Sequence, residues 1–130
     1  MSIYLKRLSA NDLGFRNGIK KQPGYILLSY KMIGSFFPYF EKNKIIDIDF
    51  LGTSPMSEEV YLRSYEQRSL LYLVIEPFLK KLELSAEDII VLKKISESRY
   101  EFSWRKPTDQ DYQSLIAELG KKKSKIITSL

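Results

Sequence analysis

Short segments in which apolar and polar residues alternate recur along this chain, and they constrain its fold more than any other feature. Alternation with a period of two is typical of a β-strand that has one buried and one solvated face. The segment KIIDIDFLG shows it most clearly, because Ile46, Ile48 and Phe50 alternate with Asp47 and Asp49. We therefore expect a mainly β protein, β-rich within the α+β class.

The alternating segments and the apolar runs beside them predict about seven strands. In the first, Ile3 and Leu5 fall on one face and Tyr4 and Lys6 on the other, which predicts a half-buried strand. The last two strands are close enough in sequence to form a hairpin. The predicted strands cover residues 3–8, 25–28, 44–52, 58–68, 70–75, 89–94 and 99–104.

Short helices complete the expected fold. Ser29 can cap a helix over residues 29–37 that Pro38 helps to stop, and Pro77 suits the first turn of another. The clearest helix begins after Thr108, stops at Gly120 and precedes a basic tail, which we expect to be a solvated end, with phosphate contact as the lesser alternative. Its apolar residues recur at helical spacing and are Tyr112, Leu115, Ile116 and Leu119; the tail is residues 121–125, KKKSK.

A long irregular loop is predicted between the first two strands. Residues 9–24 contain so many Ser, Asn, Asp, Gly and Pro residues that we expect no regular structure there. The loop carries Arg16, Lys20 and Lys21. Loops of this length in small compact domains are more often functional than idle.

The chain has the size and apolar content of one domain. Its 130 residues, 44% of them apolar, suffice for a single core, so residues 1–130 should form one unit. Neither a membrane-spanning apolar run nor a secretion signal is visible, and we expect a cytoplasmic protein without membrane contact. The net charge of +5 suits a polyanionic partner without requiring one.

The residue types that catalysis usually needs are missing. The chain has no cysteine and no histidine, which excludes disulfides, thiolate chemistry, Ser-His-Asp triads and the commonest transition-metal ligand. No acidic residue is followed two positions later by lysine, as is common in metal-dependent nucleases. Asp47 and Asp49 could share a metal ion, but a solvated strand face explains them better. We therefore expect no enzyme, no metal and no cofactor.

Two segments combine cationic side chains with amides, hydroxyls and carboxylates. They are residues 6–21, KRLSANDLGFRNGIKK, and residues 61–69, YLRSYEQRS. Lys and Arg can bind phosphates, whereas Arg, Asn, Gln, Asp and Glu can hydrogen-bond base edges in the major groove. Surface charges, an Asx turn at Asn11 and a cross-strand pair of Glu66 with Arg68 would explain the same residues without DNA.

Several strings resemble the N-terminal effector-binding domain of the EcoRII restriction endonuclease family. They are YLKRLSANDLG followed by NG, then GYIL and a segment that ends in FFP, the later EQR, and SAEDIIVLKKISESRYEF. The similarity covers most of residues 3–104, and its first motif is the most specific. The family's catalytic domain has no counterpart in this chain.

The resemblance implies a DNA-binding pseudobarrel, the architecture shared with plant B-three transcription-factor domains. Two arms would clasp the major groove, the first arm being residues 6–21 and the second arm residues 63–69. Gln67 stands where the family has a basic residue, so the target sequence would differ. The expected DNA contacts are Lys6, Arg7, Ser9, Asn11, Asp12, Arg16, Lys20 and Lys21 in the first arm, and Arg63, Glu66, Gln67 and Arg68 in the second.

The leading hypothesis is a sequence-specific double-stranded DNA-binding module, either a regulator or the recognition part of a restriction or phage-defence system. A nuclease or methyltransferase subunit is a conceivable partner. A protein-interaction or anti-restriction module on the same fold is the first alternative. A single-strand binder that stacks bases on exposed Tyr and Phe is the second.

Overall fold

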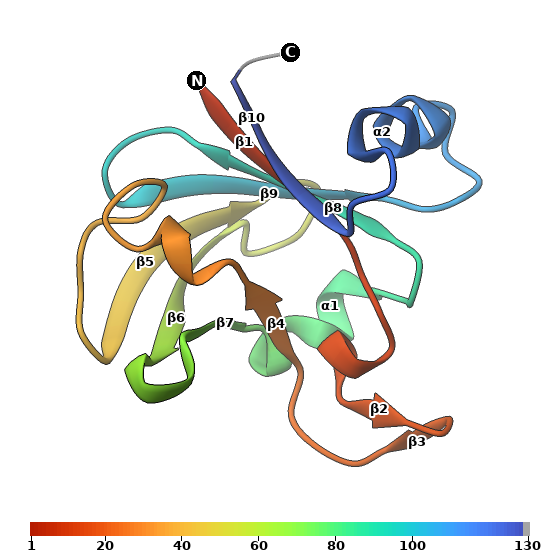
Figure 1. Ribbon diagram of the computed structural model, residues 1–130. Coiled ribbons are helices and arrows are strands. Elements are labelled where there is room, and N and C mark those ends of the chain that lie inside the picture. Colours follow the sequence, from red (N-terminus) through yellow and green to blue (C-terminus); the bar gives the residue numbers. More distant parts are fainter. Residues whose placement is uncertain (129–130) are drawn as a thin grey trace.

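The computed structural model describes residues 1–128, and strands dominate it (Figure 1). The strands are β1 (Ser2–Arg7), β2 (Phe15–Arg16), β3 (Ile19–Lys20), β4 (Tyr25–Leu28), β5 (Asn43–Phe50), β6 (Ser57–Tyr65), β7 (Leu70–Val74), β8 (Ile89–Lys94), β9 (Arg99–Arg105) and β10 (Ser124–Thr128). The helices are α1 (Leu79–Leu82) and α2 (Tyr112–Leu119), with 3-10 turns η1 (Asn11–Leu13), η2 (Tyr30–Met32), η3 (Glu66–Arg68) and η4 (Glu76–Phe78). The mainly β class predicted from the sequence is confirmed.

Eight strands form one curled sheet in the order β10-β1-β8-β9-β5-β6-β7-β4. Neighbouring strands are antiparallel except β5 and β9, which are parallel. The curl brings β4, at one edge, back toward β1, near the other edge (Figure 1). The result is a β-rich pseudobarrel.

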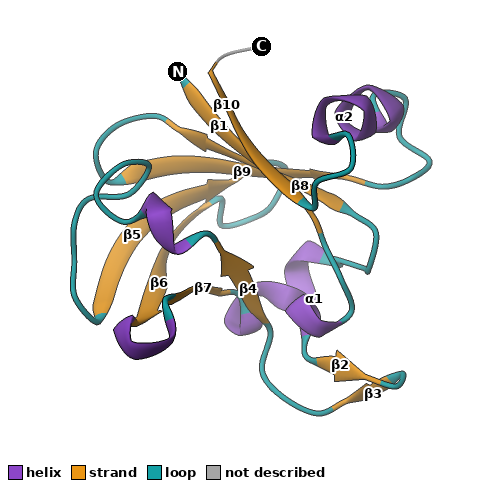
Figure 2. Cartoon of the chain, viewed as in Figure 1, coloured by secondary structure: helices purple, strands orange, loops and turns teal. Residues whose placement is uncertain are grey.

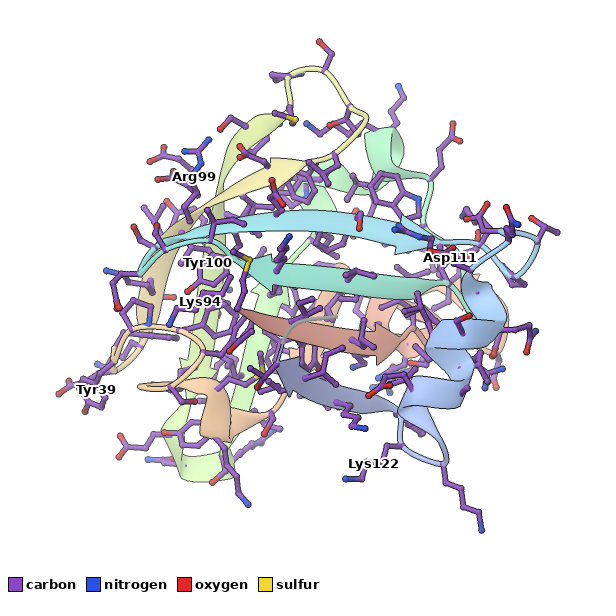
Figure 3. All side chains as sticks on the ribbon, turned by 90° about the horizontal axis from the view of Figure 1, so that it is seen from above. Tyr39, Lys94, Arg99, Tyr100, Asp111 and Lys122 are labelled. Atoms are coloured by element: carbon purple, nitrogen blue, oxygen red, sulfur yellow. The ribbon has the colours of Figure 1, made fainter. Side chains whose placement is uncertain are left out.

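Two apolar clusters hold the sheet. The main cluster fills the inside of the curl and includes Ile48, Phe50 and Tyr100, all fully buried. The second cluster lies on the outer face, where α2 packs Tyr112 and Leu115 against β1, β8 and β10. Figure 3 shows α2 over one end of this face, with Asp111 at the start of the helix.

The second cluster corrects the prediction of a half-buried first strand. Ile3 and Leu5 are covered by α2, while Tyr4 is buried in the main cluster, so β1 is buried on both faces. Burial also raises the pKa of Tyr4 to about 12. Asp49 corrects the solvated-face interpretation of β5, because it is buried and bound by Arg99 at 2.7 Å.

Each of the seven predicted strands is present, although the strand expected over residues 58–68 ends at Tyr65, and residues 66–68 form η3 instead. The predicted loop and the predicted tail differ from the structure as well. Residues 9–24 are not irregular throughout, because β2 and β3 form a small hairpin whose turn is Asn17-Gly18. Both turn residues have the positive φ that a type I′ turn requires, 52° and 76°. The basic tail is not a free end either, since β10 pairs with β1.

Helix bounds also differ from the sequence prediction. The segment expected over residues 29–37 is helical only in η2, well before Pro38. The last helix begins at Tyr112 rather than at Thr108. Within the described residues, 1–128, no helix is long and apolar enough to cross a membrane.

Candidate nucleic-acid interface

The first arm and the second arm lie on the same side of the pseudobarrel. In Figure 1 the β2–β3 hairpin and the turn between β6 and β7 both project from the side on which β4 lies. Figure 2 shows the helical turn η3 at the tip of the second projection. A hollow of about 1010 Å³ lies between them, which we call the central groove. It is lined by Lys6, Arg7, Ser9, Asn11, Asp12, Arg16, Gln22, Pro23, Tyr25, Leu27, Tyr65, Arg68, Leu70, Tyr72 and Lys123.

The central groove is strongly cationic. Five of its lining residues, Lys6, Arg7, Arg16, Arg68 and Lys123, are basic, and one, Asp12, is acidic. The lining residues carry a net charge of +4, which the pairing of Arg7 with Glu87 partly offsets. Such a concentration attracts a polyanion over a distance of about one Debye length, about 8–10 Å at physiological salt.

Lys6 and Asp12 form a buried ion pair beneath the groove. The Lys6 Nζ donates to Asp12 Oδ1 at 2.9 Å and to the Leu27 carbonyl at 2.6 Å. Asp12 also accepts hydrogen bonds from the backbone amides of Ser9 and Leu27 and from the Ser9 hydroxyl. Lys6 is 7% exposed and Asp12 4%. The charged groups of both residues are therefore buried and bonded within the protein. This differs from the direct DNA contact that the sequence predicted for them.

This ion pair fixes η1, and η1 presents Asn11. The Asp12 carboxylate ties the start of the turn to both β1 and β4. Asn11, one residue earlier, is exposed at the groove, where its side-chain oxygen lies 3.5 Å from the amide of Gln22. Arg7 is also exposed at the groove, and its guanidinium pairs with Glu87.

The β2–β3 hairpin is anchored through Lys20. Lys20 Nζ donates to the Leu13 carbonyl at 2.8 Å and to Glu76 Oε1 at 2.7 Å. The same Glu76 oxygen accepts the Gly24 amide at 2.6 Å, and these bonds, that of Lys20 first, lower the pKa of Glu76. Lys20 thus holds the base of the hairpin, whereas Arg16 lines the groove and Lys21 is exposed.

The second arm presents its polar side chains to solvent. Glu66, Gln67 and Arg68 form η3 and are all exposed. Ser69 ends the turn with a left-handed φ of 50°. Arg63 precedes η3 and lies on β6, where its guanidinium donates to the Tyr25 hydroxyl at 3.4 Å. Within residues 1–128, neither Arg68 nor the first arm's Arg16 and Lys21 form an ion pair.

A smaller hollow of about 590 Å³ lies on the other side of η3. Glu66, Gln67 and Arg68 line it together with Lys42 and Asn43. Arg68 belongs to both hollows, so η3 forms a ridge with a groove on each side. A ridge of this shape can enter a groove of a duplex while phosphates lie on its flanks.

Sequence reasoning missed the aromatic part of the central groove. Tyr25, Tyr65 and Tyr72 line it, and none of the three is among the expected DNA contacts. The signal was the alternation itself: Tyr72 lies between Leu71 and Leu73, which are fully buried, so it must point outward.

Lys123 also lines the groove, although it is not among the expected DNA contacts. It lines the groove because its carbonyl accepts the Arg7 amide at 2.9 Å, just before β10. Its neighbour Lys122 points away from the body of the molecule (Figure 3). The basic tail therefore contributes to the same surface as the two arms.

The chain is similar in fold to a known domain. No protein-family model matches it, and no curated protein matches it in sequence. Among solved structures, the N-terminal domain of Helicobacter pylori LlaJI.R1 matches with a TM-score of 0.76. The match covers 100% of both chains at 15% sequence identity. At this identity the similarity shows a shared fold.

Proposed function

We propose that this protein is a double-stranded DNA-binding module that recognises sequence with its two arms in the major groove. The observation that carries the proposal is the convergence of the two arms on one cationic groove. Asn11 and Arg68 are far apart in sequence, yet both are exposed and line the same hollow. Asn suits adenine and Arg suits guanine in bidentate hydrogen bonds to base edges.

The remaining arm residues divide by their surroundings. Exposed cations without a carboxylate partner suit phosphates, and in this role we place Arg16 and Lys21, with Lys123 beside them. Glu66 and Gln67 on η3 would contact bases with Arg68. Residues already bound within the protein would position the arms; these are Lys6, Ser9, Asp12, Lys20 and Arg63, with Arg7 shared between Glu87 and phosphate.

The fold comparison supports a recognition module within a larger system. The similar structure is an N-terminal domain, so the same fold serves there as one part of a longer protein. Together with the resemblance of several sequence segments to the EcoRII family, this favours a role in restriction or phage defence. Residues 1–130 would form the module, and a nuclease or methyltransferase subunit would be a partner for it.

Selection of bound duplexes from a randomised pool at moderate salt tests the proposal. We expect enrichment of one short motif over the background, with specific binding at least about a thousandfold tighter than binding to unrelated duplexes. Weak, uniform binding without a motif would contradict sequence recognition. Failure to bind any duplex would instead favour the protein-interaction alternative, and preference for unpaired DNA would favour the single-strand alternative.

A further inference from the structure

The bottom of the central groove is apolar and is built from three neighbouring strands. We call it the groove floor and define it by Tyr25 and Leu27 on β4, Tyr65 on β6, and Leu70 and Tyr72 on β7. The Tyr72 ring centroid lies 5.9 Å from those of both Tyr25 and Tyr65. The groove floor is therefore a continuous aromatic and aliphatic surface between the arms.

Leu27 is the most unusual member of the groove floor. Leu27 is 41% exposed, whereas Ile26 and Leu28 beside it are buried. One exposed leucine needs no explanation by itself, but this one lies opposite Tyr72 in the strand register, in a hollow flanked by cations. An apolar patch in such a place indicates a partner that presents an apolar group there.

The backbone of Leu27 is held in place from both sides. Its carbonyl accepts the Lys6 ammonium at 2.6 Å, and its amide donates to Asp12 at 3.2 Å. The same ion pair fixes η1 and hence Asn11. The apolar side chain and the amide that would contact a base are thus positioned by one buried network, so their spacing is fixed before DNA binds.

A duplex offers few apolar groups in its major groove. The base edges there are hydrogen-bond donors and acceptors, except for the C5 methyl group of thymine. A cytosine methylated at C5 presents the same group. If the arms enter the major groove as proposed above, base edges between the two contacted positions face the groove floor.

We propose that the groove floor, through Leu27 and Tyr72, recognises the 5-methyl group of a pyrimidine in the bound duplex. This inference rests on the proposed function. It specifies which chemical group of the DNA the groove floor would contact. Thymine and 5-methylcytosine share the recognised chemistry. Removing the methyl group should weaken binding about fourfold, which corresponds to one buried methyl group.

The test uses the duplex selected from the random pool. Each thymine in turn is replaced by deoxyuridine, which removes the methyl group and leaves the hydrogen-bonding edge unchanged. Each cytosine is likewise replaced by 5-methylcytosine. We expect one or two positions at which the methylated base binds about fourfold more tightly, with the remaining positions unaffected.

A variant then assigns the effect to the groove floor. In Leu27→Ala the discrimination at that position should fall to less than twofold. Ile45→Ala is the matched control, because Ile45 is 44% exposed on β5 and lies outside the residues that line the central groove. It should keep the fourfold discrimination.

The outcomes separate the two proposals. Tight, sequence-specific binding that is insensitive to every methyl substitution would overturn the inference and leave the DNA-binding function intact. A methyl effect that persists in Leu27→Ala would also overturn it. Absence of duplex binding, or preference for single strands, would overturn both.

Discussion

Lys6 on β1 and Leu27 on β4 are joined by a 2.6 Å hydrogen bond from the ammonium to the carbonyl. The two strands lie near opposite ends of the sheet order, so this bond crosses the gap where the curled sheet meets itself. Asp12 neutralises the ammonium and also binds the Leu27 amide. Closure of the pseudobarrel and placement of the first arm therefore depend on the same pair of charges.

The first prediction concerns that pair. Lys6→Met should lower the free energy of unfolding by about 3–5 kcal/mol, because it leaves the Asp12 carboxylate buried without its cation. Asp12→Asn should also destabilise the fold, because it leaves the Lys6 ammonium buried without its carboxylate partner. Urea denaturation of both single variants and of the double variant measures the coupling, which we expect to be about 1–3 kcal/mol. Strict additivity of the two substitutions would show that the pair is not a unit.

The second prediction concerns base recognition by the second arm. Arg68→Ala should cost about 1–3 kcal/mol of binding free energy on the preferred duplex and relax the preference at one base position. Binding to unrelated duplexes should change much less. Repeating the random-pool selection with the variant checks this, and an unchanged motif would place Arg68 away from the bases.

Lys21→Gln is the matched control for that substitution. Lys21 is exposed on the first arm and is proposed to contact phosphate, which carries no sequence information. The variant should bind all sequences more weakly by a similar factor and keep the wild-type motif. For this variant, the slope of the logarithm of the binding constant against the logarithm of the salt concentration should be shallower by about one.

The third prediction concerns pH. The Lys20 ammonium and the Gly24 amide lower the pKa of Glu76 in the folded protein, so the ionised form stabilises the fold. This stabilisation is present above the ordinary glutamate pKa of 4.5 and is lost as the pH falls through the lowered value. The effect should be modest, because the Glu76 side chain is 41% exposed.

Glu76→Gln isolates that contribution. At neutral pH the variant should be less stable than the wild type in urea denaturation. The difference should shrink as the pH is lowered and vanish below the folded-state pKa of Glu76. A stability difference that is independent of pH would mean that the carboxylate charge is not what anchors the hairpin.

Much of the fold followed from local patterns. Alternation located the seven predicted strands because each buried strand face must be apolar, whichever partner it meets. The Asn17-Gly18 pair is a strong sequence signal for a hairpin turn, and it predicts the β2–β3 hairpin that the structure contains. The convergence of the two arms was expected from the resemblance to the EcoRII family.

Other features depend on distant partners and could not be inferred locally. Lys6 looked like a surface cation, yet it is buried because Leu27 and Asp12 supply acceptors on two other segments. The groove floor exists only because β4, β6 and β7 lie side by side. Lys123 reaches the groove only because β10 pairs with β1.

The pairing of β1 with β10 also determines how late β1 receives one of its two neighbours. Ser2 is opposite Thr128, so during synthesis β1 receives this neighbour only after the more than one hundred residues that separate the two strands have been made. Until β10 is made, the side of β1 that faces away from β8 has unpaired amides and carbonyls, and such an edge can recruit strands from other chains. The nascent protein is therefore most exposed to aggregation in the interval before β10 emerges.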